Sequence, residues 1–320
     1  MTAAFTVPGQ GSQSPGMGKA LADAFPAARL VFEEVDAALG QHLSKLIFEG
    51  PEAELTLTAN AQPALMAVSM AVVRVLEAEA GLDLARDAQF VAGHSLGEYS
   101  ALAAAGALTI TDTARLLRLR GVSMQKAVPA GEGAMAAILG LDFGAVAAAA
   151  TEAASLFHLQ AAVCQVANDN GGGQIVISGT KAAVERAMEI AKTKGAKRCI
   201  LLPVSAPFHC ALMAPAADAM AEALASATIL PPRVPLIANV LASPINDPAE
   251  IRKRLVEQVT GTVRWRESIA FMAAQGVSTF YELGAGKVLT GLVRRIAADA
   301  HGAAIGAPAD IEAFKAAQTH

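Results

Sequence analysis

Aromatic residues and cysteines are scarce in this sequence of 320 residues. Phe, Trp and Tyr make up 4% of it, although hydrophobic residues make up 53%. The apolar content is therefore aliphatic and rich in alanine, which favours a helix-rich soluble protein with a tightly packed core. The three cysteines, Cys164, Cys199 and Cys210, are odd in number and lack the spacing of metal ligands. They predict unpaired thiols in a reducing compartment rather than a disulfide framework.

The sequence also lacks long runs of basic residues and long apolar runs free of charge. The formal net charge is −4, and no long run of Lys or Arg occurs, which argues against binding to nucleic acid. The N-terminal stretch MTAAFTVPGQGSQ has no basic segment and becomes polar after Val7, unlike a signal peptide. No stretch of about 18 apolar residues is uncharged, so we expect no membrane span and a cytoplasmic protein.

Short apolar strands alternate with amphipathic helices in the first 130 residues, which is typical of a parallel sheet. Strands are predicted at 3–7 and 88–93. Helices are predicted at 17–39, 61–80, 96–108 and 111–128. The alternation resumes near the C-terminus, with strands at 235–240 and 277–283 and helices at 247–259 and from 287.

The segment between these two parts has a different order of elements. Strands are predicted at 135–140, 162–168, 174–179 and 197–204, and helices at 143–154 and 181–195. This βαββαβ order is the signature of a small ferredoxin-like domain. The predicted fold is therefore α/β: a large α/β-hydrolase-like domain with a parallel sheet, residues 1–130 and 205–320, and an inserted ferredoxin-like domain, residues 131–204.

The stretch GHSLG at residues 93–97 follows one predicted strand and precedes a predicted helix. This Gly-x-Ser-x-Gly pattern is typical of a nucleophile elbow, in which a tight turn holds the serine hydroxyl out at the N-terminus of a helix. Ser95 is then a candidate nucleophile, and the amide of Leu96 can point at a developing oxyanion. A serine that merely caps the helix fits the same pattern, so the motif alone leaves both possibilities open.

A serine nucleophile needs a base, and the sequence offers six histidines. His94 neighbours Ser95, but adjacent side chains diverge in an elbow, so we expect it to support the turn. His209 lies in PVSAPFHCALM at the exit from the small domain, where a loop can face the carboxyl edge of the sheet. An ordinary surface imidazole is the alternative for His209. The other four histidines have helical or terminal contexts: His42, His158, His301 and His320.

Six motifs occur in order along nearly the whole chain. They are PGQGSQ, GHSLGE, RLRGVSMQ, NDNGGGQIVISG, PVSAPFHCALM and ELGAGKVLTGL. Together they resemble the malonyl-CoA:acyl carrier protein transacylase family of fatty-acid synthesis. The resemblance implies ping-pong transfer of malonyl from malonyl-CoA to the phosphopantetheine thiol of holo acyl carrier protein, through a malonyl-serine ester. It implies no metal or redox cofactor, and we expect a monomer.

The resemblance also assigns roles to single residues. It implies a Ser95–His209 dyad without a required aspartate, and a backbone carbonyl of Gln258 that orients the imidazole. A carbonyl that accepts the Nδ1–H fixes the tautomer in which Nε2 is free to take the serine proton. The backbone amides of Gln10 and Leu96 correspond to the oxyanion hole, which stabilises the transition state.

The substrate-binding residues are likewise implied by the resemblance. Arg120 in RLRGVSMQ matches the arginine that pairs with the malonyl carboxylate, which a guanidinium can bind through two parallel hydrogen bonds. From the residues alone, a solvated helix arginine would be favoured. Lys197 and Arg198 match basic residues near the CoA phosphates. The expected substrate and CoA cleft consists of Met124, Asn168, Asn170, Lys197, Arg198 and Phe208.

Alternative functions share part of this pattern. A freestanding acyltransferase that serves a polyketide synthase would use the same chemistry with a different carrier protein. A serine esterase has the same elbow, but would normally place an acidic triad member between Ser and His, and would not need Arg120. A catalytically inactive docking subunit would not need an intact Ser95, His209 and Arg120.

Overall fold

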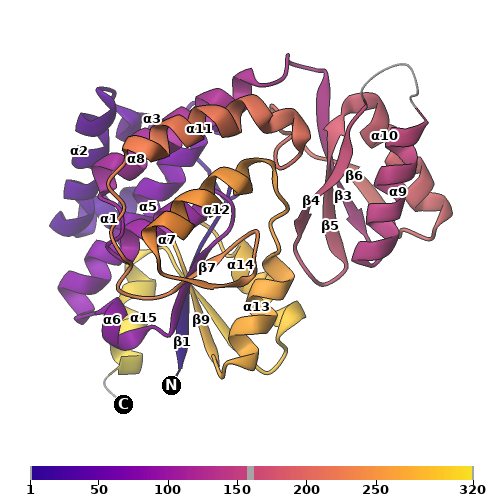
Figure 1. Cartoon of the computed structure of the whole chain (residues 1–320). Coiled ribbons are helices and arrows are strands. Elements are labelled where there is room, and N and C mark those ends of the chain that lie inside the picture. The colour runs from indigo at the N-terminus through magenta and orange to yellow at the C-terminus, as the bar shows by residue number, and fades with distance from the viewer. Residues whose placement is uncertain (1, 157–161, 319–320) are drawn as a thin grey trace.

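The computed structural model describes residues 2–156 and 162–318, which form two β-sheets flanked by helices (Figure 1). The larger sheet has six strands in the order β10-β9-β1-β2-β7-β8. Its strands are β1 (Ala3–Val7), β2 (Phe90–Gly93), β7 (Leu236–Ala238), β8 (Ser243–Ile245), β9 (Thr279–Leu283) and β10 (His301–Ile305). Five of them are parallel, and β8 at one edge is antiparallel. The predicted α/β class with a mainly parallel sheet is therefore confirmed.

Both faces of the larger sheet are buried, because successive residues of a strand point to opposite faces. In β1, Phe5 and Val7 pack into one core. Ala4 of β1 and Ala92 of β2 pack into a second core on the other face.

The helices of this part are α1 (Lys19–Ala24), α2 (Pro26–Leu39), α3 (Leu43–Glu49), α4 (Glu52–Thr56), α5 (Thr58–Ala80), α6 (Leu84–Asp87), α7 (Gly97–Ala104), α8 (Ile110–Lys126), α11 (Ala214–Ser226), α12 (Pro248–Thr260), α13 (Trp265–Ala274), α14 (Val288–Ile296) and α15 (Pro308–Gln318).

Helix α5 is long and apolar enough to cross a membrane, by length and composition only. However, 83% of its most apolar window is buried inside the molecule, where it packs against α2, α7 and α8. The core helix of a soluble protein passes the same length test. We therefore interpret α5 as the central packing helix of the first core.

The smaller sheet has four antiparallel strands in the order β4-β5-β3-β6. They are β3 (Gly133–Leu139), β4 (Cys164–Asp169), β5 (Gln174–Thr180) and β6 (Arg198–Leu201). Helices α9 (Phe143–Ser155) and α10 (Lys181–Thr193) cover the face that is turned away from the larger sheet (Figure 1). Near the end of β4, Asn168 forms a bridge to Val263, just before α13. This contact fixes one edge of the smaller sheet beside the carboxyl ends of β1 and β2.

Several elements differ from the sequence-based expectation. The helix predicted at 17–39 is two helices, because Pro26 lacks the amide hydrogen needed to continue α1 and instead starts α2, after Phe25 in an extended conformation. The helix α13 and the strand β10 were not predicted. In β10 the sequence HGAAI has no alternation of apolar and polar residues, and the parallel pairing with β9 defines the strand.

Candidate active site

Ser95 lies on a tight turn between β2 and α7, with φ at 55°, in the left-handed region. The flanking glycines allow this turn to pack closely. A Cβ on Gly93 would lie 1.9 Å from the carbonyl group of Gly97, and one on Gly97 would lie 2.4 Å from Val7 O. The side chain of Asn239 holds both sides of the turn, since its Oδ1 accepts from Ser95 N at 2.8 Å and its Nδ2 donates to Gly93 O at 2.7 Å. The geometry is that of a nucleophile elbow.

The Ser95 hydroxyl caps no helix amide and instead contacts His209. The distance from Ser95 Oγ to His209 Nε2 is 2.7 Å. On the other side of the ring, His209 Nδ1 lies 2.9 Å from Gln258 O and 3.2 Å from Gly261 O. Since a carbonyl can only accept, Nδ1 carries the hydrogen and Nε2 accepts from the serine hydroxyl.

His209 is buried, with 4% of its surface exposed. Burial, followed by the positive charge of Arg120, lowers its pKa to about 3. The imidazole is therefore neutral at physiological pH and able to accept a proton. His209 also has a positive φ, 58°, which places its side chain at the turn that follows Phe208.

Arg120 lies on α8 with 1% of its surface exposed. Its guanidinium donates to Gln62 Oε1 at 2.8 Å, to Gln258 Oε1 at 2.9 Å and to Ser95 Oγ at 3.1 Å. All three acceptors are uncharged, and no carboxylate of the described residues forms an ion pair with this arginine. Burial accordingly lowers the pKa of Arg120. A buried cation without a contacting anion is costly, and an anionic ligand would compensate it.

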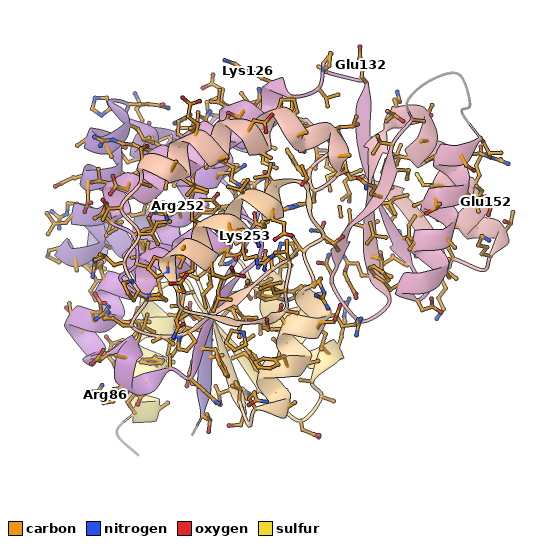
Figure 2. The ribbon with its side chains drawn as sticks, in the orientation of Figure 1. Arg86, Lys126, Glu132, Glu152, Arg252 and Lys253 are labelled. Carbon is orange, nitrogen blue, oxygen red and sulfur yellow. The ribbon has the colours of Figure 1, made fainter. Side chains whose placement is uncertain are left out.

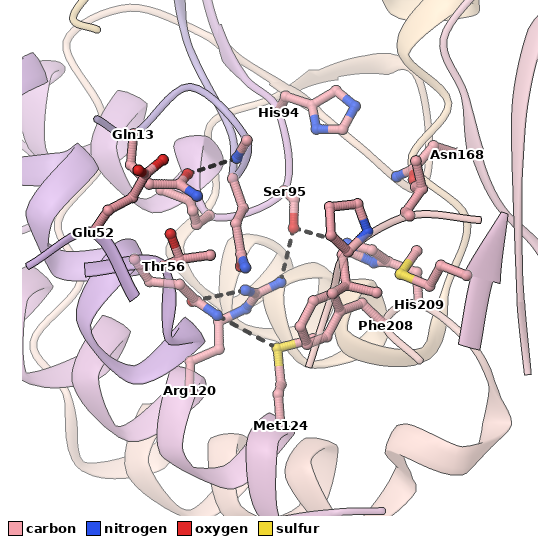
Figure 3. A pocket seen from close by; sticks show the side chains of 18 residues that line it. Gln13, Glu52, Thr56, His94, Ser95, Arg120, Met124, Asn168, Phe208 and His209 are labelled. Carbon is pink, nitrogen blue, oxygen red and sulfur yellow. Dashed lines mark hydrogen bonds between the residues drawn. The ribbon is translucent and has the colours of Figure 1, made fainter. Parts of the chain in front are cut away.

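A cavity of about 440 Å³, the Ser95 cavity, opens in front of these side chains. Figure 3 shows Ser95, His209 and Arg120 pointing toward one another at its wall, with Met124 and Phe208 beside them. The sequence-predicted residues that line it are Gln10, Ser95, Leu96, Arg120, Met124, Asn168, Phe208 and His209. The cavity therefore brings together a nucleophile, a base and a free cation from distant parts of the chain.

The sequence of this chain matches the acyl transferase domain family over residues 4–307. It is 51% identical over 293 residues to the malonyl CoA-acyl carrier protein transacylase of Bacillus subtilis, a match that covers 92% of this chain and 90% of the relative. The chain belongs to the acyl transferase family. The resemblance inferred from the six motifs is thereby confirmed.

Solved structures of acyl transferases agree with this assignment. The acyl-carrier-protein-S-malonyltransferase of Bartonella henselae has a TM-score of 0.96 and 59% identity over the whole of both chains. A malonyl-transacylase solved in complex with a type II polyketide acyl carrier protein has a TM-score of 0.94 and 42% identity, over 99% of this chain and 100% of that one. The fold and the sequence therefore lead to the same family.

Gln10 and Leu96, whose backbone amides are predicted to form an oxyanion hole, both line the Ser95 cavity. Leu96 N lies at the start of α7, and Gln10 N lies in the loop after β1. Neither amide has a hydrogen-bond acceptor within the described parts of the chain. The Gln10 side chain is held by Thr58 Oγ1, 2.9 Å from its Nε2. Both amides are thus available as donors, and their catalytic role remains a prediction.

Three predicted cleft residues lie outside the Ser95 cavity. Asn170 contacts His94, with 2.9 Å between Oδ1 and Nε2, and lines an adjoining cavity of about 220 Å³. Lys197 lines a separate cavity beside the glycine-rich turn 171–173, and Arg198 is exposed at the start of β6. The chain reaches the Ser95 cavity only at Leu202, about 13 Å further along at about 3.3 Å per residue of strand. Lys197 and Arg198 therefore do not line the Ser95 cavity itself, and their expected place near the CoA phosphates stays a prediction.

The other nucleophiles and histidines of this acyl transferase have little to offer the site. Cys210 is next to His209, but its thiol is fully buried, donates to Pro207 O, and has a raised pKa because of burial. His42 and His301 are exposed away from the cavity, while His158 and His320 lie outside the described residues. Among residues 2–156 and 162–318, no group of three His, Cys, Asp or Glu side chains could hold a metal ion.

Sequence reasoning missed three buried polar residues around the site. They are Gln62, which accepts from Arg120, Glu98, which accepts from Gln258, and Asn239, which holds the elbow. Gln62 and Glu98 each interrupt an apolar helix, in AQPALMAV and GEYSALAA. A polar side chain at a buried helix position needs a partner, and that signal would have identified both residues.

Proposed function

We propose that this protein transfers the malonyl group of malonyl-CoA to the phosphopantetheine thiol of an acyl carrier protein. The observation that carries the proposal is the buried Arg120 guanidinium beside the Ser95–His209 pair, because it offers an unpaired cation 3.1 Å from the nucleophile. An acyl group with a free carboxylate satisfies that cation, and a neutral acyl group does not. The relatives described above, a malonyl CoA-acyl carrier protein transacylase and a malonyl-transacylase bound to an acyl carrier protein, support the same substrate and carrier.

The first half-reaction acylates Ser95. Its hydroxyl attacks the thioester carbonyl of malonyl-CoA while the proton passes to His209 Nε2. The amides of Gln10 and Leu96 donate to the resulting oxyanion, each worth about 3 kcal/mol to the transition state. The tetrahedral intermediate then breaks its C–S bond, and CoA leaves as a thiol with the proton from His209.

The second half-reaction reverses these proton transfers with a new thiol. The phosphopantetheine thiol of the holo carrier protein gives its proton to His209 and attacks the malonyl-serine ester. When the C–O bond breaks, Ser95 recovers its proton from His209. The carbonyls of Gln258 and Gly261 hold the imidazole in one orientation through both halves. No acidic triad member is needed in this arrangement.

Phe208 contributes to the choice between malonyl and methylmalonyl groups in this proposal. Its side chain lines the cavity next to His209 and is 8% exposed. A ring at this point would crowd an α-methyl group. A single methyl group usually discriminates by about 1–3 kcal/mol, so Phe208 gives a limited preference for malonyl over methylmalonyl groups. Arg120 acts on the separate choice between acyl groups with and without a carboxylate.

The acidic carrier protein would dock on a basic patch, which we define as Lys287, Arg294 and Arg295. All three are exposed at or on α14. Val288, next to Lys287, lines the cavity of about 220 Å³ that shares Gln10 with the Ser95 cavity. A carrier bound there could deliver its phosphopantetheine arm to Ser95 through the adjoining cavities. An ordinary charged helix face is the competing interpretation.

A freestanding acyltransferase of a polyketide synthase is the second candidate function. It is favoured by the likeness to the malonyl-transacylase solved with a polyketide carrier protein. The chemistry at Ser95 would be the same, and only the carrier would differ. A serine esterase is less well supported, because carbonyl groups rather than an acid orient His209.

We also propose a division into two domains, residues 1–130 with 205–320 and residues 131–204. The strand order β4-β5-β3-β6, with α9 and α10 on one face, supports a ferredoxin-like description of the smaller unit. The mainly parallel sheet with the elbow after β2 supports an α/β-hydrolase-like description of the larger unit. We further propose that the protein is cytoplasmic and monomeric.

A transfer assay tests the proposed function. The protein is mixed with malonyl-CoA and a holo fatty-acid carrier protein, or with a holo polyketide carrier protein, and the malonylated carrier is measured by mass spectrometry. The proposal expects transfer at catalytic rates that needs the phosphopantetheine group. Release of free malonate at the same rate with or without a carrier would instead identify a hydrolase.

A further inference from the structure

Glu98 is a buried acid that the mechanism above does not use. It lies on α7, three residues after Ser95, and its side chain is fully buried. Its Oε2 accepts from Gln258 Nε2 at 2.6 Å and from Asn239 N at 3.3 Å. Its Oε1 has no hydrogen-bond partner in the described parts of the chain. A buried carboxyl group with an unsatisfied oxygen is costly, so its position requires a functional explanation.

Gln258 connects this acid to the reacting groups. The Nε2 that donates to Glu98 also donates to Ser95 O at 2.9 Å, while Oε1 accepts from Arg120 at 2.9 Å. The main-chain carbonyl of Gln258 accepts from His209. This carbonyl is free to do so because it lies in the last turn of α12, where carbonyls have no helical partner. One residue thus contacts the elbow, the cation and the base.

The partners of the Gln258 amide determine which way it faces. An amide side chain has a donor at one end and an acceptor at the other, and rotation by half a turn exchanges them. Glu98 Oε2 lies at the donor end, and Arg120, which can only donate, lies at the acceptor end. Without Glu98, Nε2 would keep only Ser95 O at 2.9 Å and Asn239 Oδ1 at 3.4 Å.

Glu98 and Arg120 also influence each other's ionisation. The negative form of Glu98 favours the cationic form of Arg120, and Arg120 in turn favours the ionised form of Glu98. Burial has the larger effect on Glu98 and raises its pKa to about 8.

We propose that Glu98 is a positioning residue for substrate choice. By holding the Gln258 amide, it aims the Arg120 guanidinium at the site of the substrate carboxylate and steadies the carbonyl that orients His209. This inference rests on the proposed function, because it takes Arg120 as the group that binds the malonyl carboxylate. Selection for malonyl over acetyl groups then depends on Glu98, although Glu98 contacts neither acyl group.

Three variants separate positioning from simple structural support. Glu98→Met removes the acceptor, and Glu98→Gln keeps an oxygen for Gln258. The matched control is Glu282→Met, since Glu282 is also a buried acid that accepts backbone amides, from Leu289 and Thr290 at the start of α14, and it does not line the Ser95 cavity. For each variant, Tm and the ratio of kcat/KM for malonyl-CoA over acetyl-CoA are measured.

Glu98→Met is expected to lower the malonyl-to-acetyl ratio about 10-fold or more, because a slightly misplaced clamp can cost about 100-fold in rate. Glu98→Gln should keep the ratio within about 3-fold, since an amide oxygen can still accept. Glu282→Met should lower Tm and leave the ratio unchanged. If Glu98→Met does not fold, Glu98→Asp, which withdraws the carboxyl group from Gln258, takes its place. An unchanged ratio in the folded Glu98 variant overturns the inference, as does an equal change in Glu282→Met.

A second readout keeps this test separate from the proposed function. Absence of malonyl transfer by the wild-type protein would contradict the proposed function but not the role of Glu98. The rate at which phenylmethylsulfonyl fluoride modifies Ser95 depends on His209 and needs no malonyl group. That rate should fall in Glu98→Met and not in Glu282→Met. Equal rates in the two variants would overturn the positioning role whether or not malonyl is the substrate.

Discussion

At the scale of single residues, the proposed choice of substrate depends on the buried Arg120. The Arg120→Ala variant should lose most malonyl transfer. Its acetyl transfer should be retained or rise, because a neutral acyl group no longer meets an unpaired cation. Arg118→Ala is the control, since Arg118 lies on the same helix but donates to Asn60 and Gln41. Steady-state kinetics with both thioesters give the ratio. A malonyl preference that survives Arg120→Ala would place the carboxylate clamp elsewhere.

His209 gives a pH prediction whose sign follows from its lowered pKa. The folded value of about 3 lies below the ordinary value of 6.5. As the pH falls through this window, the unfolded chain binds the proton before the folded chain, so His209 lowers stability progressively. In His209→Asn this effect is absent, and the Tm of the wild type should therefore fall more than that of the variant between pH 7 and pH 5. Because the pKa of Glu98 is raised, the folded chain binds that proton before the unfolded chain as the pH falls, which increases stability. This effect is present in both the wild type and the variant, so it does not alter the comparison.

The comparison of thermal unfolding curves at the two pH values checks this prediction. A difference in Tm that is the same at pH 7 and pH 5 would mean that His209 titrates alike in the folded and unfolded chains. Its burial would then not control its ionisation.

The sequence predicted Ser95, His209 and the Gln258 carbonyl beside the imidazole, but not the other polar residues around them. Ser95 and His209 stand in recognisable motifs, and the structure places them 2.7 Å apart. Glu98 and Asn239 act through contacts between segments that are 141 residues apart in the sequence. Such contacts depend on the tertiary fold, which local patterns do not encode. The expected contact of Lys197 and Arg198 with the CoA phosphates stays a prediction, since neither residue lines the Ser95 cavity.

At the scale of elements, the glycines of the elbow set how closely β2, α7 and β1 can pack. In Gly93→Ala the new Cβ would meet the backbone of Gly97 at 1.9 Å, so we expect a loss of several kcal/mol or failure to fold. Gly291→Ala is the matched control. Gly291 lies within α14, and a Cβ there has nothing within 4 Å, so alanine should stabilise the helix by about 0.5–1 kcal/mol.

Denaturant unfolding of the two glycine variants measures both effects. Equal stability of Gly93→Ala and the wild type would show that the elbow can open without penalty, which the close contact with Gly97 does not allow.

The longer elements were predictable because their patterns are strong. Helix α8 and strands β1 and β2 agree with prediction to within a few residues, and the segment 131–204 has the predicted order of strands and helices. The misses have local causes. Pro26 divides a continuous apolar pattern into two helices, and the short helices α3 and α4 are held by packing rather than by periodicity.

At the scale of the whole molecule, charge is spread around the surface rather than concentrated. In Figure 2, Arg86 lies at the lower left, Lys126 and Glu132 at the top, and Glu152 at the right of the molecule, so both signs of charge occur around its outline. The net charge is −4, so attraction of an acidic carrier protein must be local. The basic patch on α14 is the proposed location.

Charge reversal tests that location. Lys287→Glu should raise KM for the carrier protein and leave KM for malonyl-CoA unchanged, because it removes a local attraction without entering the cavity. The control is Lys192→Glu, an exposed lysine of α10. This helix covers the face of the smaller sheet that is turned away from the larger sheet. Equal effects of Lys287→Glu on both KM values would indicate a CoA contact or a folding defect rather than carrier docking.

The central claim for the whole molecule is that a malonyl ester forms on Ser95 and is then passed on. Its most direct test begins with brief treatment of the protein with malonyl-CoA. One sample is then digested at once, and a parallel sample receives holo carrier protein before digestion. The peptides of both samples are compared by mass spectrometry. One malonyl group is expected on the peptide that contains Ser95, with its loss when holo carrier protein is added and no adduct in Ser95→Ala. A malonyl adduct on the peptide of Cys210, or an adduct that persists in Ser95→Ala, would contradict it.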